Sequence, residues 1–149
     1  MNILIYKTQP RLVFYSLGNI YKFFESSKEC ADEIKLISSS PMKIHFDSKT
    51  NYTMSMVEII FKGDHYYTMK PAKGKKLDIY DNDKNFQLAG RCLNIFHMLS
   101  QKEEKNKSFL YGDFIADHLF IDNNEKKITL IDPGNGFGIN GNIEIDLAR

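Results

Sequence analysis

Residues 110–122 have the sequence LYGDFIADHLFID, and residues 127–134 follow as KITLIDPG. These stretches hold two short apolar runs, Leu119–Ile121 and Ile128–Ile131, which are joined by a polar turn of Asp, Asn, Glu and Lys residues. Apolar, β-branched runs bounded by Asn and Asp clusters are typical of the two strands of a hairpin. We therefore predict a β-hairpin here, and the rest of the chain is interpreted around it.

Polar side chains gather at the open end of this hairpin. Symmetrical pairing about the turn sets residue 118 roughly opposite residues 131–132, so His118 and Asp132 come close together. Asp113 arrives on the loop just before the first strand. Two carboxylates and one imidazole that converge at a strand edge predict a functional site.

Three motifs in order carry a resemblance to a known family. They are YGD-x4-H at residues 111–118, IDPG at 131–134 and EIDLA at 144–148. They resemble the catalytic core of the protein-kinase-like phosphotransferases. The Gly before Asp113, the Asp-Pro after Ile131 and the Asp-Leu-Ala ending are typical of the small-molecule branch, to which the aminoglycoside phosphotransferases belong, or of an atypical kinase.

The resemblance implies an α+β fold in two lobes. We expect residues 1–69 to form an N-lobe, a small antiparallel sheet with one helix at about 27–38, and residues 70–76 to form a hinge. Residues 77–149 would form a helical C-lobe with the catalytic loop and the metal motif. Because the sequence ends three residues after Asp146, this C-lobe is expected to be short and incomplete, either minimal or truncated. Asp146 itself would brace the catalytic loop.

Local patterns place the elements within these lobes. The Ser16–Asn19 stretch is a predicted hairpin turn, Ser26 or Ser27 is a predicted helix N-cap, and residues 62–64 form a tight turn. Apolar side chains at helical spacing predict a second helix from about Phe86 to Gln101. The expected strands are Ile3–Tyr6, Leu12–Tyr15, Asn19–Phe24, Met42–Phe46 and Thr53–Phe61.

Composition excludes several classes of function. The chain has 149 residues, of which 42% are hydrophobic and 26% charged, and this is enough for a packed core. A net charge of +1 gives no argument for nucleic acid or a membrane surface as a partner. Cys30 and Cys92 lack C-x-x-C spacing, so we expect neither zinc nor a disulfide but buried thiols in a reducing compartment. The predicted location is the cytoplasm.

Lys22 lies in an alternating strand that precedes a Glu-rich helix. A lone lysine in such a strand usually extends its amine to solvent. The resemblance instead implies that Lys22 holds the ATP phosphates and that Glu33 positions it. Glu29, one turn earlier, is the alternative partner, and a solvated glutamate on a surface helix is the structural alternative.

The resemblance also implies where the rest of the nucleotide binds. Met69 would lie beside the adenine pocket, and backbone groups from Lys70 to Ala72 would hydrogen-bond adenine. Asp113 would act as catalytic base towards the attacking hydroxyl, and Asp132 would bind Mg²⁺, which prefers carboxylate oxygen.

The sequence departs from the family at two places. His118 stands where the second metal ligand is normally Asn, and imidazole suits softer metals than Mg²⁺. Three alternatives follow: His118 coordinates Mn²⁺, Asp117 substitutes as ligand, or the second metal is lost. Thr8–Arg11 contains no glycine where protein kinases have a glycine-rich loop.

Two functions follow from this pattern. The first is an ATP-dependent kinase that transfers the γ-phosphoryl group to a hydroxyl of a small molecule or protein. The alternative is a catalytically weak, ATP-binding pseudokinase with a regulatory or interaction role. A homo-oligomer or a protein partner is expected to complete the C-lobe. The third hypothesis is a fold that binds no nucleotide, in which the Asp-rich hairpin is merely structural.

Overall fold

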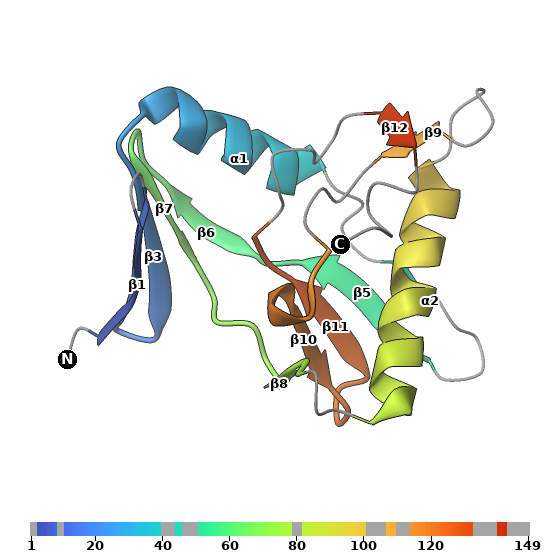
Figure 1. Cartoon of the computed structure of the whole chain (residues 1–149). Coiled ribbons are helices and arrows are strands. Elements are labelled where there is room, and N and C mark those ends of the chain that lie inside the picture. The colour runs from blue at the N-terminus through green and yellow to red at the C-terminus, as the bar shows by residue number, and fades with distance from the viewer. Residues whose placement is uncertain are drawn as a thin grey trace. The chain divides into compact units, whose positions relative to one another are not determined.

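The computed structural model describes residues 3–8, 11–39, 44–45, 51–78, 82–100, 107–109, 114–132 and 140–142. The chain divides into two compact units (Figure 1). The first unit is Met1–Ser40 with Met56–Ala72, and the second is Pro41–Ser55 with Lys73–Arg149. The boundary after Ala72 falls inside the expected hinge. Pro41–Ser55, which we expected in the N-lobe, groups with the second unit instead.

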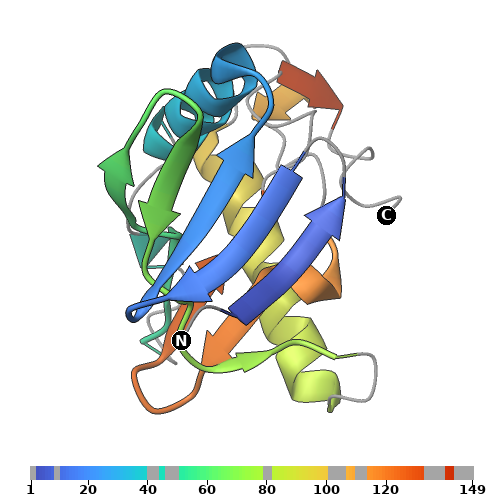
Figure 2. The ribbon, with the colours of Figure 1, turned by 90° about the vertical axis from the view of Figure 1, so that its left-hand side faces the viewer.

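The first unit is a five-stranded sheet with one helix. The strand order is β1-β2-β3-β7-β6, and every neighbouring pair is antiparallel. Helix α1 packs against β3 and β7, and Figure 2 looks onto this sheet. The elements are β1 (Ile3–Thr8), β2 (Arg11–Ser16), β3 (Asn19–Phe24), α1 (Ser27–Ser39), β6 (Ile59–Lys62) and β7 (Tyr66–Met69).

Local chemistry explains where these elements begin and end. Leu17 and Gly18 have φ angles of 50° and 80°, and two successive left-handed residues fit the twist of a tight hairpin. The predicted turn at Ser16–Asn19 is thus confirmed. Helix α1 follows Ser26, whose Oγ accepts the N–H of Glu29 at 3.4 Å. Such a bond satisfies a donor that the first helical turn leaves unpaired.

The two faces of the sheet have different chemistry. On one face, cross-strand pairing sets Lys22 beside Val13 and Tyr67. On the other face, aromatic rings stack across three strands, with Phe14 to Phe23 centroids 5.3 Å apart and Phe23 to Tyr66 centroids 5.1 Å apart. Cross-strand aromatic pairs stabilise a sheet and fix its register.

The second unit contains another five-stranded sheet, with strand order β4-β5-β11-β10-β8, and the longer helix α2. Strands β9 and β12 pair separately. Its apolar core comes from the sheet and from one face of α2. The elements are β4 (Ile44–His45), β5 (Thr53–Met56), β8 (Lys75–Lys76), α2 (Asp83–Ser100), β9 (Lys107–Phe109), a 3-10 turn (Ala116–His118), β10 (Leu119–Asp122), β11 (Lys127–Leu130) and β12 (Asn140–Asn142). The buried apolar residues include Met54, Leu88, Cys92, Leu119, Ile121, Ile128 and Leu130.

The predicted hairpin is confirmed. Leu119 pairs with Leu130, and Asp122 pairs with Lys127. The turn connects Asp122 to Lys127. The side chain of Asp122 closes this turn, because its Oδ1 accepts the backbone N–H groups of Asn124 at 2.9 Å and Glu125 at 3.0 Å. An Asp that bonds the backbone two and three residues onward is typical of such turns.

The predicted single strand Thr53–Phe61 is wrong. It forms two strands of different sheets, β5 and β6, with Val57 and Glu58 between them. The start of β5 is held against the β10–β11 hairpin, since Thr53 N–H donates to the carbonyl of Lys126 at 2.9 Å. A run of apolar residues does not reveal such a change of sheet.

Part of the expected hinge is also a strand. Lys75 and Lys76 pair with Ile121 and Phe120 at the edge of β10. Gly74 permits this approach, because its φ is +93° and a Cβ there would overlap the carbonyl oxygen of Ile121. Only glycine combines a left-handed backbone with such close contact.

Helix α2 begins earlier than predicted, at Asp83. Asn82 caps it, since its Oδ1 accepts the N–H of Asn85 at 3.1 Å. Among the described helices, none has the length and apolar character needed to cross a bilayer.

Candidate functional site

The structure brings Lys22 and Glu33 together in the first unit. Lys22 Nζ lies 2.6 Å from Glu33 Oε1. The hydroxyl of Tyr67 donates to the same oxygen at 2.7 Å. The side chains of Lys22 and Glu33 are only 3% and 6% exposed, so this is a buried, hydrogen-bonded ion pair.

The helical and strand periods explain this convergence. Cys30, Glu33 and Ile37 recur at helical spacing on the buried face of α1. Glu29, the alternative partner, is exposed. On the sheet, Lys22 and Tyr67 are direct cross-strand neighbours, so both side chains point from the same face toward the helix.

Burial decides between the interpretations of Lys22. A lysine that extends to solvent would be largely exposed, whereas Lys22 is buried. Taking two charges out of water costs several kcal/mol per ion, and the cost is offset only by close geometry and further hydrogen bonds. The short contact with Glu33 and the hydroxyl of Tyr67 provide both. The protein therefore maintains a cation at a fixed position in this sheet.

Arg11 adds a second cation to the same carboxylate. Its Nη2 atom lies 3.4 Å from Glu33 Oε2, and its side chain is 31% exposed. Both Arg11 Cζ and Lys22 Nζ lie 5.6 Å from the centroid of the Phe24 ring, a distance typical of cation–π contacts. Two cations thus flank one aromatic ring and one carboxylate.

The predicted adenine-binding segment follows directly after β7. Met69 is buried and pairs with Ile20. The N–H of Lys70 already donates to the carbonyl of Glu58 at 3.2 Å, and Pro71 has no N–H. The carbonyl of Lys70 and the N–H of Ala72 therefore stand as the candidate acceptor and donor of this segment.

In the second unit, the backbones of His118 and Ile131 pair at the open end of the hairpin, and Asp132 follows directly. Ile131 N–H donates to the carbonyl of His118 at 3.0 Å, so the expected pairing of residue 118 with 131–132 is confirmed. Asp132 has a φ of +55°, a left-handed conformation that Asp adopts more readily than most residues. Asp117, the alternative metal ligand, pairs with Lys76 at 3.1 Å and is largely exposed.

The donors present fit Mg²⁺ only partly. Mg²⁺ is commonly held by one or two carboxylates together with substrate phosphates, so Asp132 is a suitable ligand. Within the described ranges, no group of three or more His, Cys, Asp and Glu side chains is placed to hold a metal by itself. The predicted base Asp113, Asp146 and the Gly-rich stretch 134–138 lie outside the described residues.

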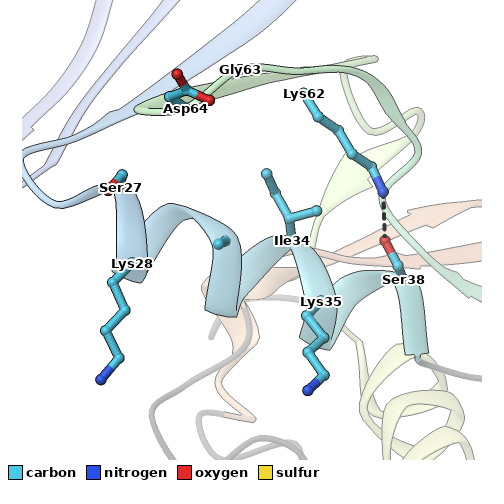
Figure 3. A pocket seen from close by; sticks show the side chains of 9 residues that line it. Ser27, Lys28, Ile34, Lys35, Ser38, Lys62, Gly63 and Asp64 are labelled. Carbon is cyan, nitrogen blue, oxygen red and sulfur yellow. Dashed lines mark hydrogen bonds between the residues drawn. The ribbon is translucent and has the colours of Figure 1, made fainter.

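A shallow hollow of about 780 Å³ lies elsewhere in the first unit, between α1 and the β6–β7 turn. None of the predicted site residues lines it. Figure 3 shows Lys28 and Lys35 pointing away from the Lys62–Asp64 turn. Lys62 bonds the hydroxyl of Ser38 at 3.2 Å. This hollow is therefore not the predicted site.

Two residues around Lys22, Tyr67 and Arg11, were not predicted from the sequence. Tyr67 had a usable signal, because it lies two residues before Met69 on the same face of an alternating strand. Arg11 had none beyond its place at the start of β2. Its role depends on which strand pairs with which.

Comparison with known proteins identifies the fold. No protein-family model matches the chain, and no curated protein matches it in sequence. The GDP and kanamycin complex of APH(2")-IIia matches with a TM-score of 0.65 and 11% identity, over 98% of this chain and 70% of that chain. The streptomycin-ATP-APH(2")-IIa ternary complex gives 0.58 and 13%, over 98% and 70%. The ADP-bound aminoglycoside phosphotransferase APH(2'')-Ib gives 0.56 and 11%, over 98% and 69%.

These likenesses confirm the predicted fold. The chain has the α+β, protein-kinase-like architecture of the aminoglycoside phosphotransferases. It spans about 70% of the length of APH(2")-IIia.

Proposed function

We propose that this chain is an ATP-dependent phosphotransferase, which transfers the γ-phosphoryl group of ATP to a hydroxyl. The observation that carries the proposal is the buried pair of Lys22, on the central strand β3, and Glu33, on helix α1, at 2.6 Å. Phosphoryl transfer requires positioned cations more than covalent chemistry from the protein. A lysine that is buried and held in place by an ion pair meets this requirement.

The first unit would bind the nucleotide. Lys22 contacts the phosphates, and Glu33, held by Tyr67, positions its amine. Adenine presents an amino donor beside a ring-nitrogen acceptor. The carbonyl of Lys70 and the N–H of Ala72 complement that pair, with Met69 packed beside the ring.

The second unit would supply the metal and the base. Asp132 would hold Mg²⁺ through its carboxylate, and the bound ion would supply positive charge for phosphoryl transfer. His118 would be a second ligand where Mn²⁺ replaces Mg²⁺. Asp113 accepts or orients the proton of the attacking hydroxyl.

The substrate class follows from the neighbours in fold. Their structures hold nucleotides together with kanamycin or streptomycin. This supports a small molecule that carries hydroxyl groups as the acceptor. A protein hydroxyl is the second choice.

One observation favours a pseudokinase. His118 occupies the position of the second metal ligand, and imidazole is a poor ligand for Mg²⁺. In that case the chain binds ATP and acts as a regulatory or interaction module. Transfer is then weak or absent.

The experiment is mass spectrometry of acceptors after incubation with ATP and Mg²⁺ or Mn²⁺. The acceptors are aminoglycosides and simple polyols, and the variants are Asp113→Asn and, as a control, Asp83→Asn, an exposed carboxylate at the start of α2. The enzyme hypothesis predicts one added phosphoryl group, lost with Asp113→Asn and kept with Asp83→Asn. ATP binding without transfer to any acceptor favours the pseudokinase. If wild type neither binds ATP nor transfers a phosphoryl group to any acceptor, both hypotheses are refuted.

A further inference from the structure

Arg11 lies on the same face of the sheet as Lys22. It opens β2 and pairs with Thr8 of β1 and Phe24 of β3. Since Val13 is the direct neighbour of Lys22, Arg11 lies two residues from that position on the same face. The backbone thus presents two cations from adjacent strands to one region.

Both cations already share an anion. Lys22 approaches Oε1 of Glu33 at 2.6 Å and Arg11 approaches Oε2 at 3.4 Å. The Glu33 carboxylate shows that the two side chains converge on a single anionic group. A phosphate group presents oxygens of similar spacing and charge.

The two cations are held very differently. Lys22 is 3% exposed and at short contact. Arg11 is 31% exposed, and its contact is longer than the 2.7–2.9 Å typical of a charge-assisted hydrogen bond. A partly exposed ion pair of this length contributes little to stability. Arg11 is therefore the more exposed and less closely paired of the two cations on Glu33.

The sequence that leads into Arg11 has no glycine. Gly-rich turns bind phosphate through closely approaching N–H groups. Residues 8–11 are Thr-Gln-Pro-Arg, with no glycine, and Pro10 has no N–H to donate. A guanidinium, which binds phosphate oxygens through two parallel N–H groups, supplies the missing donors.

We propose that Arg11 is a phosphate-binding residue, which clamps the nucleotide phosphates from the β2 side while Lys22 holds them from β3. This inference rests on the proposed function. It adds a specific residue that replaces the backbone donors of a glycine-rich turn.

The test compares nucleotides that differ only in phosphate. Calorimetry measures adenosine, ADP and ATP binding to wild type, Arg11→Gln and Arg11→Lys. Lys35→Gln serves as control, since it removes one positive charge from the exposed part of α1. Inorganic tripolyphosphate tests the phosphate site in the absence of adenine, and its binding is measured as a shift in the Tm of the protein.

Loss of a charged hydrogen bond weakens ATP binding by about tenfold or more. We expect that loss for Arg11→Gln, with adenosine binding unchanged and the tripolyphosphate shift reduced. Arg11→Lys should fall between, and Lys35→Gln should match wild type. If Arg11→Gln weakens adenosine and ATP binding equally, or weakens neither, Arg11 does not bind the phosphates. The proposed function would still stand in that case, provided that wild type binds ATP. If wild type binds no nucleotide and no tripolyphosphate, both proposals fail.

Discussion

The hydroxyl of Tyr67 donates to Oε1 of Glu33 at 2.7 Å, and Lys22 approaches this same oxygen at 2.6 Å. Tyr67 therefore orients the carboxylate that orients the lysine. The ring of Tyr67 is 1% exposed, so water cannot replace its hydroxyl. The Lys22–Glu33 pair thus has a third member, which comes from the neighbouring strand.

Tyr67→Phe should lower the free energy of unfolding by about 2 kcal/mol, because a buried hydrogen bond to a charged group is lost while the ring remains. Urea denaturation of the purified variant measures this loss. Tyr66→Phe is the matched control, since Tyr66 is one residue earlier, half-buried, and stacked on Phe23 on the opposite face. Similar stabilities for the two variants would contradict the role of Tyr67.

Glu33→Gln should be more severe. It leaves the buried Lys22 without its counter-ion, and breaking one side of a buried pair costs about 3–5 kcal/mol. Glu29→Gln removes the same charge from an exposed position of the same helix and should change stability by less than about 0.5 kcal/mol. Thermal and urea unfolding of both variants check the contrast. A stable Glu33→Gln protein would show that the pair contributes little.

Substitution of alanine for glycine should destabilise the protein at two positions and stabilise it at a third. Gly74→Ala should destabilise by about 3 kcal/mol, because the new Cβ would overlap the backbone of Ile121 and the φ is +93°. Gly18→Ala, with a φ of +80° but open space, should cost about 1 kcal/mol. Gly90→Ala lies within α2 with nothing near its Cβ and should stabilise by about 0.5–1 kcal/mol. The order of the three unfolding free energies tests the strand pairing at Gly74.

The two buried thiols predict an alkaline loss of stability. Burial raises the pKa of Cys30 and of Cys92 above their ordinary value of 9.0, and the Glu33 carboxylate adds to the rise at Cys30. Above pH 9 the unfolded chain loses thiol protons that the folded chain retains. The unfolding free energy should therefore be unaffected by the thiols below pH 9 and fall progressively above it.

Unfolding free energies between pH 7.5 and about 10.5 measure this slope. Cys92→Ala lowers stability at every pH through the cavity it leaves. It should also make the alkaline decline less steep, because one of the titrating groups is gone. An unchanged slope in that variant would count against thiol titration as the cause.

Much of the first unit could be predicted from sequence because its signals are local. Alternation along Asn19–Phe24 and helical spacing around Glu33 are each visible within one element. The hairpin of the second unit was equally clear, since its turn residues bound both strands. The protein-kinase-like fold followed from the order of three motifs.

What the sequence could not show is pairing between distant segments. The break at Val57–Glu58 moves the chain from one sheet to another, and β8 exists only because Gly74 lets Lys75 reach β10. Arg11 joins Glu33 through strand register, which no local pattern encodes. The roles of Asp113 and Asp132 stay predictions.

The most direct test of the account is ATP binding by calorimetry with and without Mg²⁺ or Mn²⁺. Asp132→Asn removes the carboxylate charge and keeps a residue that tolerates the left-handed backbone of this position. Asp83→Asn is the control, an exposed carboxylate at the start of α2. We predict metal-dependent ATP binding in wild type and in Asp83→Asn, weakened at least about tenfold in Asp132→Asn. Binding that depends on neither the metal nor Asp132 would contradict the phosphotransferase, and absence of ATP binding in wild type would contradict any ATP-dependent function.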